Sequence, residues 1–360
     1  MNLVHTEIVI PVHDKTRPIR RAADSVLADP NCGVIVVAHN IDPDILDIPT
    51  SDRVKVVSLN AAKGMPGATF DAGIAAATAP WVGIMGSDDW YEPGALTKMY
   101  EHAERDDADG VIAPLRDQLH KSNNLKPLTF RRKRLKAVAD RMFYRTAPLG
   151  IFRSEILKKD RYAFGAIFPV GSDMRVSALL WTSGLSLSYY WDDPAYVVGR
   201  DAQTRVTFTP RPMERTLAPL FGLFSEPDVQ SFSERQKHAL ALKIARVHVA
   251  DIVRLRPNQA DWCSEDFEVL CKFLQELRNF DARFDRGLAI RDFKIIQAIE
   301  DHDQSKMLKE SAAWSSASFK DRVLTNSLAS TIFEQDGPIQ RAVSALILKA
   351  RSKLEPFFRN

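Results

Sequence analysis

Hydrophobic and polar positions in the first hundred residues predict strands and helices in turn. Four short runs are apolar almost throughout, as expected of strands buried on both faces, and they cover Glu7–Val12, Gly33–Ala38, Arg53–Leu59 and Trp81–Met85. Between the first two runs, apolar residues from Ile19 to Leu27 recur every three or four positions, which indicates a helix with one buried face. Residues 64–79 predict a second helix, with a face of alanines that can lie close to a sheet. This order of elements is typical of a parallel sheet with right-handed crossovers.

The pattern changes near residue 210. Before this point, further short apolar runs predict strands at 110–114, 184–190 and 195–198. Prolines between residues 210 and 227 mark a linker, and beyond it the apolar positions follow helical spacing over 236–255, 267–280, 293–298 and 323–333. The sequence therefore predicts two domains, an α/β domain over 1–210 and a helical domain over 211–360.

Two adjacent carboxylates, Asp88 and Asp89, follow the fourth predicted strand after Gly86 and Ser87. In open α/β sheets, ligands bind just beyond the carboxyl ends of the strands. Carboxylates placed there can hold a hard divalent cation, which in turn holds phosphate oxygens. A surface turn is the alternative interpretation, because aspartate is common in turns.

Composition and charge exclude several classes of protein. The net charge of +3 and the pI of about 8.6 are too mild to predict nucleic acid as a partner. The cysteines Cys32, Cys263 and Cys271 lack metal-site spacing and indicate a reducing compartment. No run is long and apolar enough to span a bilayer, and the chain goes into a strand without a signal-peptide pattern. These features predict a cytoplasmic protein.

Several motifs occur in a fixed order along residues 6 to about 205. The first strand ends in Pro11–Asp14, the helix after it contains Arg20–Leu27 with the sequence RRAADSVL, and a glycine-rich turn at Gly64–Gly67 opens the next helix. The acidic stretch Met85–Pro93 reads MGSDDWYEP. In this order and spacing, the chain resembles bacterial-type family 2 glycosyltransferases with the GT-A fold.

The resemblance implies both a fold and a reaction. The fold is a Rossmann-like α/β sheet of mixed direction with helices on both faces, here followed by a helical C-terminal region. The reaction is the transfer of a sugar, with inversion, from a nucleotide diphosphate sugar to a hydroxyl of a glycan, lipid-linked or polymer acceptor, as in polysaccharide biosynthesis. A UDP-sugar is the expected donor, with dTDP and GDP donors left open, and the enzyme would be a hexosyltransferase.

The resemblance also implies roles for individual residues. Asp173, at the start of a predicted helix, falls on the position of the catalytic base, and Asp88, supported by Asp89, on that of the ligand for Mg or Mn. The nucleotide is expected to contact residues at strand ends, namely Pro11, His13, Asn40, Asp42, Lys63, Ser87 and Asp88. Asp173 can also be a helix cap, and a carboxylate at a helix N-terminus stays ionised in either role.

Two positions depart from the family pattern, because Ala38 and Gly86 stand where relatives carry acids that contact the base and the ribose. The first alternative is therefore a catalytically degenerate GT-A-like module that binds a nucleotide or glycan without turnover. The second is a nucleotidyltransferase. That class would need a glycine-rich loop directly after the first strand, and Asp14–Arg17 contains cations but no glycine.

The last predicted helix, Pro338–Leu354, is amphipathic and basic. Such a helix can lie on an anionic membrane, which would place the protein peripherally on the inner face of the membrane. More often such a helix is a docking or dimer helix, so a homo-oligomer formed through the C-terminal helices is the other expectation.

Overall fold

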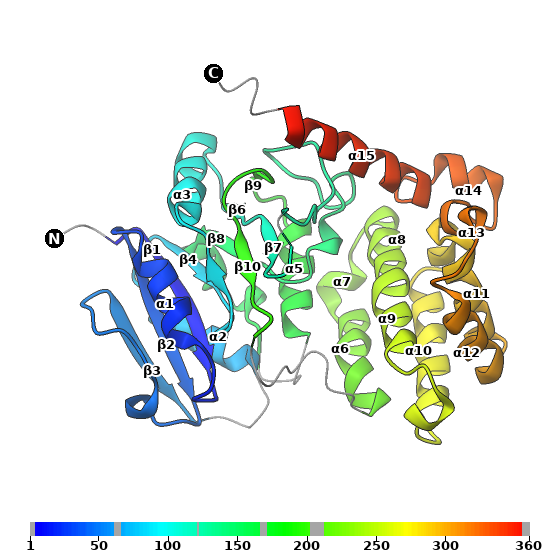
Figure 1. Cartoon of the computed structure of the whole chain (residues 1–360), viewed down its shortest axis with the longest axis horizontal. Coiled ribbons are helices and arrows are strands. Elements are labelled where there is room, and N and C mark those ends of the chain that lie inside the picture. The colour runs from blue at the N-terminus through cyan, green and yellow to red at the C-terminus, as the bar shows by residue number, and fades with distance from the viewer. Residues whose placement is uncertain (1–3, 61–65, 121, 166–170, 202–211, 355–360) are drawn as a thin grey trace. The chain divides into compact units, whose positions relative to one another are not determined.

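The computed structural model describes residues 4–60, 66–120, 122–165, 171–201 and 212–354, and Figure 1 labels their helices and strands. The chain forms two compact units. The sheet unit contains the described residues within 1–126, 131–136 and 145–209, and the helical unit those within 127–130, 137–144 and 210–360. Two short segments from the first half of the chain therefore belong to the helical unit. The predicted domain boundary after residue 210 stays a prediction.

A seven-stranded mixed sheet forms the centre of the sheet unit, in the order β3-β2-β1-β4-β8-β6-β9. The strands β3, β2, β1 and β4 are parallel, β8 runs antiparallel to β4 and β6, and β9 is parallel to β6. Their bounds are β1 Thr6–Val12, β2 Cys32–His39, β3 Val54–Leu59, β4 Trp81–Ile84, β6 Gly110–Ile112, β8 Gly150–Arg153 and β9 Leu187–Tyr189. The predicted mixed sheet, with its four N-terminal strands, is confirmed.

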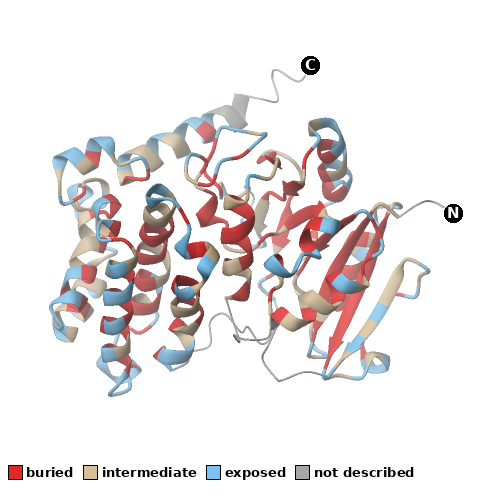
Figure 2. Ribbon diagram, turned by 180° about the vertical axis from the view of Figure 1, so that it is seen from behind, coloured by how far each residue is buried: buried red, intermediate tan, exposed pale blue. Residues whose placement is uncertain are grey.

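Helices cover both faces of this sheet. Successive residues of a strand point to opposite faces, and Ile8 and Ile10 of β1 share one buried cluster with residues of α1 and α3. On the other face, Val9 lies against Gly73 of α2, where any side chain at position 73 would collide with it. Glycine therefore lets α2 approach the sheet, and Figure 2 shows the central strands buried. The helix bounds are α1 Ile19–Leu27, α2 Pro66–Ala76, α3 Ala95–Asp106, α4 Ser154–Leu157 and α5 Ser172–Thr182.

A second, three-stranded sheet in the same unit has the order β5-β10-β7. Its central strand β10 (Tyr196–Val198) pairs antiparallel with β5 (Trp90–Tyr91) and parallel with β7 (Leu115–Asp117). Because β5 begins one residue after Asp89, this small sheet holds the acidic turn in place.

Arg145 is a buried cation that links the end of β6 to the loop before β8. Its Nη2 donates to the carbonyl oxygens of Ala113 and Leu149 at 2.5 and 3.0 Å. Trp181 Nε1 donates to the Arg145 carbonyl at 3.0 Å. Desolvation by burial lowers the pKa of Arg145 to about 10, so the side chain remains charged at neutral pH.

We expect Arg145→Met to lower the free energy of unfolding of the sheet unit by about 2–4 kcal/mol, because it leaves buried carbonyl groups without their donor. Urea denaturation followed by tryptophan fluorescence measures the change. The matched control is Arg20→Met, because Arg20 is half exposed and its ion pairs with Asp24 and Asp47 are 3.6 and 3.8 Å long. Its effect should stay within about 0.5 kcal/mol. Equal effects for the two variants would contradict the role given to Arg145.

The helical unit surrounds an apolar core that includes Phe273 of α10, whose ring lies 5.7 Å from that of Phe224. The predicted helix 236–255 is present as α8, a π-helical segment and α9. The prediction of one helix over 323–333 is wrong, because α13 ends at Val323 and Ser327 caps a new helix, α14. The bounds are α6 Met213–Ser225, α7 Pro227–Gln230, α8 Glu234–Lys243, α9 Ala250–Arg254, α10 Asp266–Phe280, α11 Ile290–Glu300, α12 Gln304–Ala313, α13 Phe319–Val323, α14 Leu328–Phe333 and α15 Pro338–Leu354. Across the described residues, none of the helices combines the length and the hydropathy needed to cross a membrane.

Asp336 connects distant parts of the helical unit. Its carboxylate pairs with Arg141, Arg246 and Arg341 at 3.0–3.1 Å and accepts a hydrogen bond from the Tyr144 hydroxyl at 2.6 Å. Burial alone would raise the pKa of Asp336, but Arg246 and Arg341 outweigh it and lower the pKa, so the carboxylate stays ionised. These contacts explain why residues 137–144 pack with the helical unit.

His238 of α8 is a second charged group in this unit. Its Nδ1 lies 2.6 Å from Asp281 Oδ2 and its Nε2 3.2 Å from Glu334 Oε1. Burial alone would lower the pKa of His238, but the hydrogen bonds with these two carboxylates raise it to about 9. The imidazole is therefore protonated at neutral pH.

This pKa shift predicts a pH dependence of stability. The raised pKa stabilises the folded state fully below about pH 6.5, and this contribution of ~3 kcal/mol is lost as the pH rises through 9. The difference in unfolding free energy between the wild type and His238→Gln should therefore shrink between pH 6.5 and pH 9. Chemical denaturation at a series of pH values measures it, and a difference that stays constant over this range would contradict the charged pair.

Candidate functional site

The acidic turn after β4 lies at the edge of the sheet where parallel strands end. The amide of Asp89 donates to the Gly86 carbonyl at 3.2 Å, which closes the turn. A side chain at position 86 would lie 2.6 Å from Asp89 Oδ2. Gly86, which departs from the family pattern, therefore leaves the space that the Asp89 carboxylate occupies.

Two arginines surround Asp88. Arg17 Nη1, in the turn before α1, lies 2.7 Å from Asp88 Oδ2, and the two side chains are only 8% and 16% exposed. Arg21, in the first turns of α1, donates from Nη2 to the Asp88 carbonyl at 2.6 Å and pairs with Asp201 at 2.5 Å. Its guanidinium also stacks on the Trp90 ring at 4.3 Å. The tip of β4 thus combines two guanidinium groups with the carboxylates of Asp88 and Asp201 that pair with them.

Asp89 makes different contacts, because it faces the small sheet. Its Oδ2 accepts a hydrogen bond from the Tyr196 hydroxyl at 2.5 Å, and its Oδ1 accepts one from the Gly199 amide at 2.8 Å. The Tyr196 hydroxyl in turn accepts from the Gly86 amide at 3.0 Å. Burial and the Asp89 carboxylate raise the pKa of Tyr196, so the hydroxyl remains a donor. Asp89 therefore connects the turn to β10.

The residues of the turn fit a hard divalent cation held mainly by Asp88. Arg17 pairs with one of the two Asp88 oxygens. Within the described ranges, no other side chain is hydrogen-bonded to the second oxygen. Magnesium often takes only one or two carboxylates and completes its coordination with substrate phosphates and water. The supporting role predicted for Asp89 as a metal ligand stays a prediction, since both of its oxygens already accept hydrogen bonds.

The other residues predicted to bind the nucleotide lie at the carboxyl ends of β1, β2 and β4. Pro11 lies in the ladder of β1, opposite Val37 of β2. Asn40, with a φ of 54°, and Asp42 are exposed directly after β2, and Asp42 accepts a hydrogen bond from the Asp44 amide at 3.0 Å. Because β1, β2 and β4 are parallel, these residues share one edge of the sheet with Asp88.

Ser87 and His13 complete this edge, whereas Lys63 lies outside the described residues. Ser87 is buried within the acidic turn, and His13 follows β1. Partial desolvation, then the Arg17 charge, lower the pKa of His13, so its imidazole is neutral at neutral pH. A neutral imidazole can donate or accept a hydrogen bond without adding charge.

Sequence reasoning missed several residues of this edge. Arg17 and Arg21 are four positions apart, a spacing that places two side chains on one side of a helical turn and could have indicated their common target. His39, the last residue of β2, is buried, and its Nε2 has no hydrogen-bond partner among the residues described. Tyr196 gave no local signal, because it lies 107 positions from Asp89.

The proposed base, Asp173, lies in the first turn of α5. Asp71 of α2 accepts hydrogen bonds from the amides of Phe164 and Gly165, both at 2.7 Å. Residues 166–170, between this contact and α5, lie outside the described residues. The role of Asp173 therefore stays a prediction.

A separate group of possible metal ligands lies at the opposite ends of the strands. Atoms of His5, Asp29 and Cys32 are within 4.8 Å of one another. Asp29 already accepts hydrogen bonds from Thr97 at 2.5 Å and from the Asn31 amide at 3.0 Å. Burial raises the pKa of the Cys32 thiol, which disfavours the thiolate that metals bind. This group therefore has a structural explanation, and it does not include the predicted ligands.

Residues 7–161 match the family described as Glycosyl transferase family 2. The succinoglycan biosynthesis protein ExoO of Rhizobium meliloti (strain 1021) is 31% identical over 101 residues, which cover 27% of this chain and 29% of ExoO. The chain therefore aligns with less than a third of this relative. The resemblance to family 2 glycosyltransferases is confirmed over residues 7–161.

Solved structures with a similar fold include TarS residues 1–349 of S. aureus. Its complex with UDP-GlcNAc gives a TM-score of 0.68 at 14% identity, covering 86% of this chain and 91% of that one. A second structure of TarS residues 1–349 gives a TM-score of 0.63 at 13% identity, covering 87% of this chain and 92% of that one. These likenesses confirm the predicted GT-A fold with its helical C-terminal region.

Proposed function

We propose that this protein is an inverting glycosyltransferase that moves a sugar from a UDP-sugar to a hydroxyl of a glycan, lipid-linked or polymer acceptor. The observation that carries the proposal is the turn at Asp88, placed at the carboxyl edge of a GT-A sheet and surrounded by Arg17 and Arg21. The UDP-GlcNAc complex of TarS supports a UDP-sugar donor. The name of ExoO supports a role in polysaccharide biosynthesis.

The leaving nucleotide diphosphate gains negative charge as the bond to the sugar breaks. A divalent cation, Mg or Mn, held by Asp88 would neutralise part of this charge. Arg17, which is only 8% exposed, adds fixed positive charge where electrostatic interactions are stronger than in water. Ser87, His13, Asn40 and their neighbours would hold the nucleotide at the strand ends.

The acceptor hydroxyl attacks well only when a carboxylate accepts its proton, and we assign this role to Asp173. The N-terminus of α5 keeps a carboxylate in its first turn ionised, which suits a general base. Attack from the side opposite the leaving group inverts the anomeric carbon. In-line attack therefore requires Asp173 and the diphosphate held at Asp88 to lie on opposite sides of the anomeric carbon.

A degenerate nucleotide- or glycan-binding module remains the second candidate. Ala38 at the end of β2 favours it, because no side chain there can contact the base as an acid would. This module would bind a UDP-sugar without releasing UDP. The cytoplasmic location, a membrane contact and a homo-oligomer formed by the C-terminal helices stay predictions.

The proposal is tested by thermal shift and UDP release with UDP-GlcNAc, UDP-glucose, GDP-mannose and a dTDP-sugar, each with and without Mn²⁺. We expect one UDP-sugar with Mn²⁺ to raise the melting temperature by about 5 °C when it is near a hundredfold above its Kd. We also expect slow release of UDP. Binding without release would indicate the degenerate module, and the absence of any shift would overturn both candidates.

A further inference from the structure

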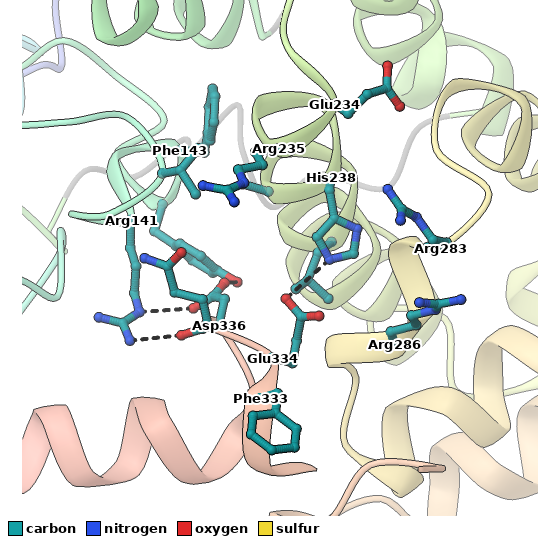
Figure 3. Close-up of a pocket in the computed structure, with 15 residues that line it drawn as sticks. Arg141, Phe143, Glu234, Arg235, His238, Arg283, Arg286, Phe333, Glu334 and Asp336 are labelled. Atoms are coloured by element: carbon teal, nitrogen blue, oxygen red, sulfur yellow. Dashed lines mark hydrogen bonds and ion pairs between the residues drawn. The ribbon is translucent and has the colours of Figure 1, made fainter. Parts of the chain in front are cut away.

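The helical unit contains a cavity of about 390 Å³ that lies wholly within it (Figure 3). Its walls come from α8, from the turn after α10, from the end of α14 and from residues 138–144. Its volume falls within the range of pockets that hold small molecules. The cavity uses none of the residues assigned to the donor site.

The acidic side chains on the wall are already paired with cations. Glu334 pairs with His238, and Asp336 with three arginines. Glu234, at the rim, has Lys237 at 3.8 Å. The carboxylates of the pocket are therefore neutralised by partners within the same unit.

Three arginines on the wall have no such partner. Arg235 lies on α8, and Arg283 and Arg286 lie in the turn after α10, on the other side of His238 in the view of Figure 3. None of their guanidinium groups makes a hydrogen bond or ion pair with any residue that the structure describes. Asp281, two positions before Arg283 in the chain, is already paired with His238. The pocket thus combines paired acids with unpaired guanidinium groups, which leaves a positive surface.

We propose that this cavity is a binding site for a ligand carrying phosphate groups. A guanidinium group presents parallel N–H donors that match phosphate oxygens, and it stays charged at all physiological pH values. Three such groups around one cavity suit a ligand with more than one phosphate. Phe143 and Phe333 on the same wall offer apolar contact to the uncharged part of that ligand.

The phosphate could belong to a soluble ester or to a lipid headgroup. Phe333 is 79% exposed and neighbours other exposed apolar side chains of α14 and α15, namely Leu328, Ile332, Val343, Leu346 and Ile347. A lipid headgroup in the pocket would bring this surface to the bilayer. Two measurements distinguish a soluble phosphate ester from a lipid headgroup as the ligand.

The first arm measures binding of inorganic pyrophosphate to the full chain by isothermal titration calorimetry. We expect Arg283→Gln/Arg286→Gln to lose one binding site, or to weaken it at least tenfold. The control Lys272→Gln/Lys309→Gln removes the same charge from exposed positions outside the pocket and should keep the wild-type stoichiometry. Because only the loss of one site is scored, pyrophosphate binding at the donor site does not affect the outcome.

The second arm measures flotation with phosphatidic acid vesicles against phosphatidylcholine vesicles. Arginine-dependent binding to phosphatidic acid identifies the lipid source, and arginine-dependent binding to pyrophosphate alone identifies the soluble source. Arg235→Gln serves as a second variant if the double variant does not fold, as judged by circular dichroism. The proposal is overturned if the pocket variants bind pyrophosphate and phosphatidic acid as well as the wild type does. It is also overturned if the wild type binds neither probe.

Discussion

Asp88→Asn should lower the rate of UDP-sugar turnover by about 10³-fold, because the loss of several kcal/mol of charge stabilisation costs a factor of ten for every ~1.4 kcal/mol. The substitution keeps the shape of the side chain but removes the charge that would hold Mg or Mn. The Mn²⁺-dependent part of the thermal shift with the donor should disappear as well. UDP release and melting temperature, each with and without Mn²⁺, measure the two effects.

Asp107→Asn is the matched control for Asp88→Asn. Asp107 lies in the same unit, its side chain is 98% exposed, and its left-handed backbone conformation also suits asparagine. Its turnover and melting temperature should equal those of the wild type. If Asp88→Asn retained metal-dependent turnover within a few-fold of the wild type, Asp88 could not be the metal ligand.

Asp173→Asn should lower turnover by about 10²–10⁴-fold, the usual contribution of a general base. Unlike Asp88→Asn, it should leave the Mn²⁺-dependent thermal shift with the donor unchanged, because Asp173 is assigned to the acceptor side. Single-turnover assays and thermal shift on the same preparation measure both quantities.

The two variants together separate catalysis from binding. Ser172→Ala, at the neighbouring position of α5, controls for disturbance of the helix start and should keep turnover within a few-fold of the wild type. An Asp173→Asn protein that turned over donor at the wild-type rate would remove the base assignment. The assignment of Asp88 as the metal ligand would not be affected by that result.

The contrast between Asp88 and Asp89 shows how far local sequence reaches. The two adjacent acids after an apolar strand predicted one metal site in which both carboxylates take part. In the structure, Asp88 pairs with Arg17, whereas Asp89 accepts hydrogen bonds from Tyr196 and Gly199. The side chains of neighbouring residues can point in opposite directions. The sequence pattern does not indicate which distant residue each side chain contacts.

The arginine-lined pocket had no sequence signal at all. Its walls come from α8, the turn after α10, the end of α14 and residues 138–144, which share no spacing or motif. Residues 138–144 are more than 60 positions from the rest of the wall, and the Asp336 contacts with Arg141 and Tyr144 hold them in the helical unit.

The sequence alone determined the order of strands and helices, the GT-A sheet and the position of the acidic turn. These follow from the period of apolar residues and from short motifs, which depend on neighbours within a few positions of one another. Only the tertiary structure decided which acid faces the arginines, which segments of the chain belong to each unit and where unpaired guanidinium groups gather. Those outcomes depend on contacts between residues tens to hundreds of positions apart, which packing selects and local pattern does not encode.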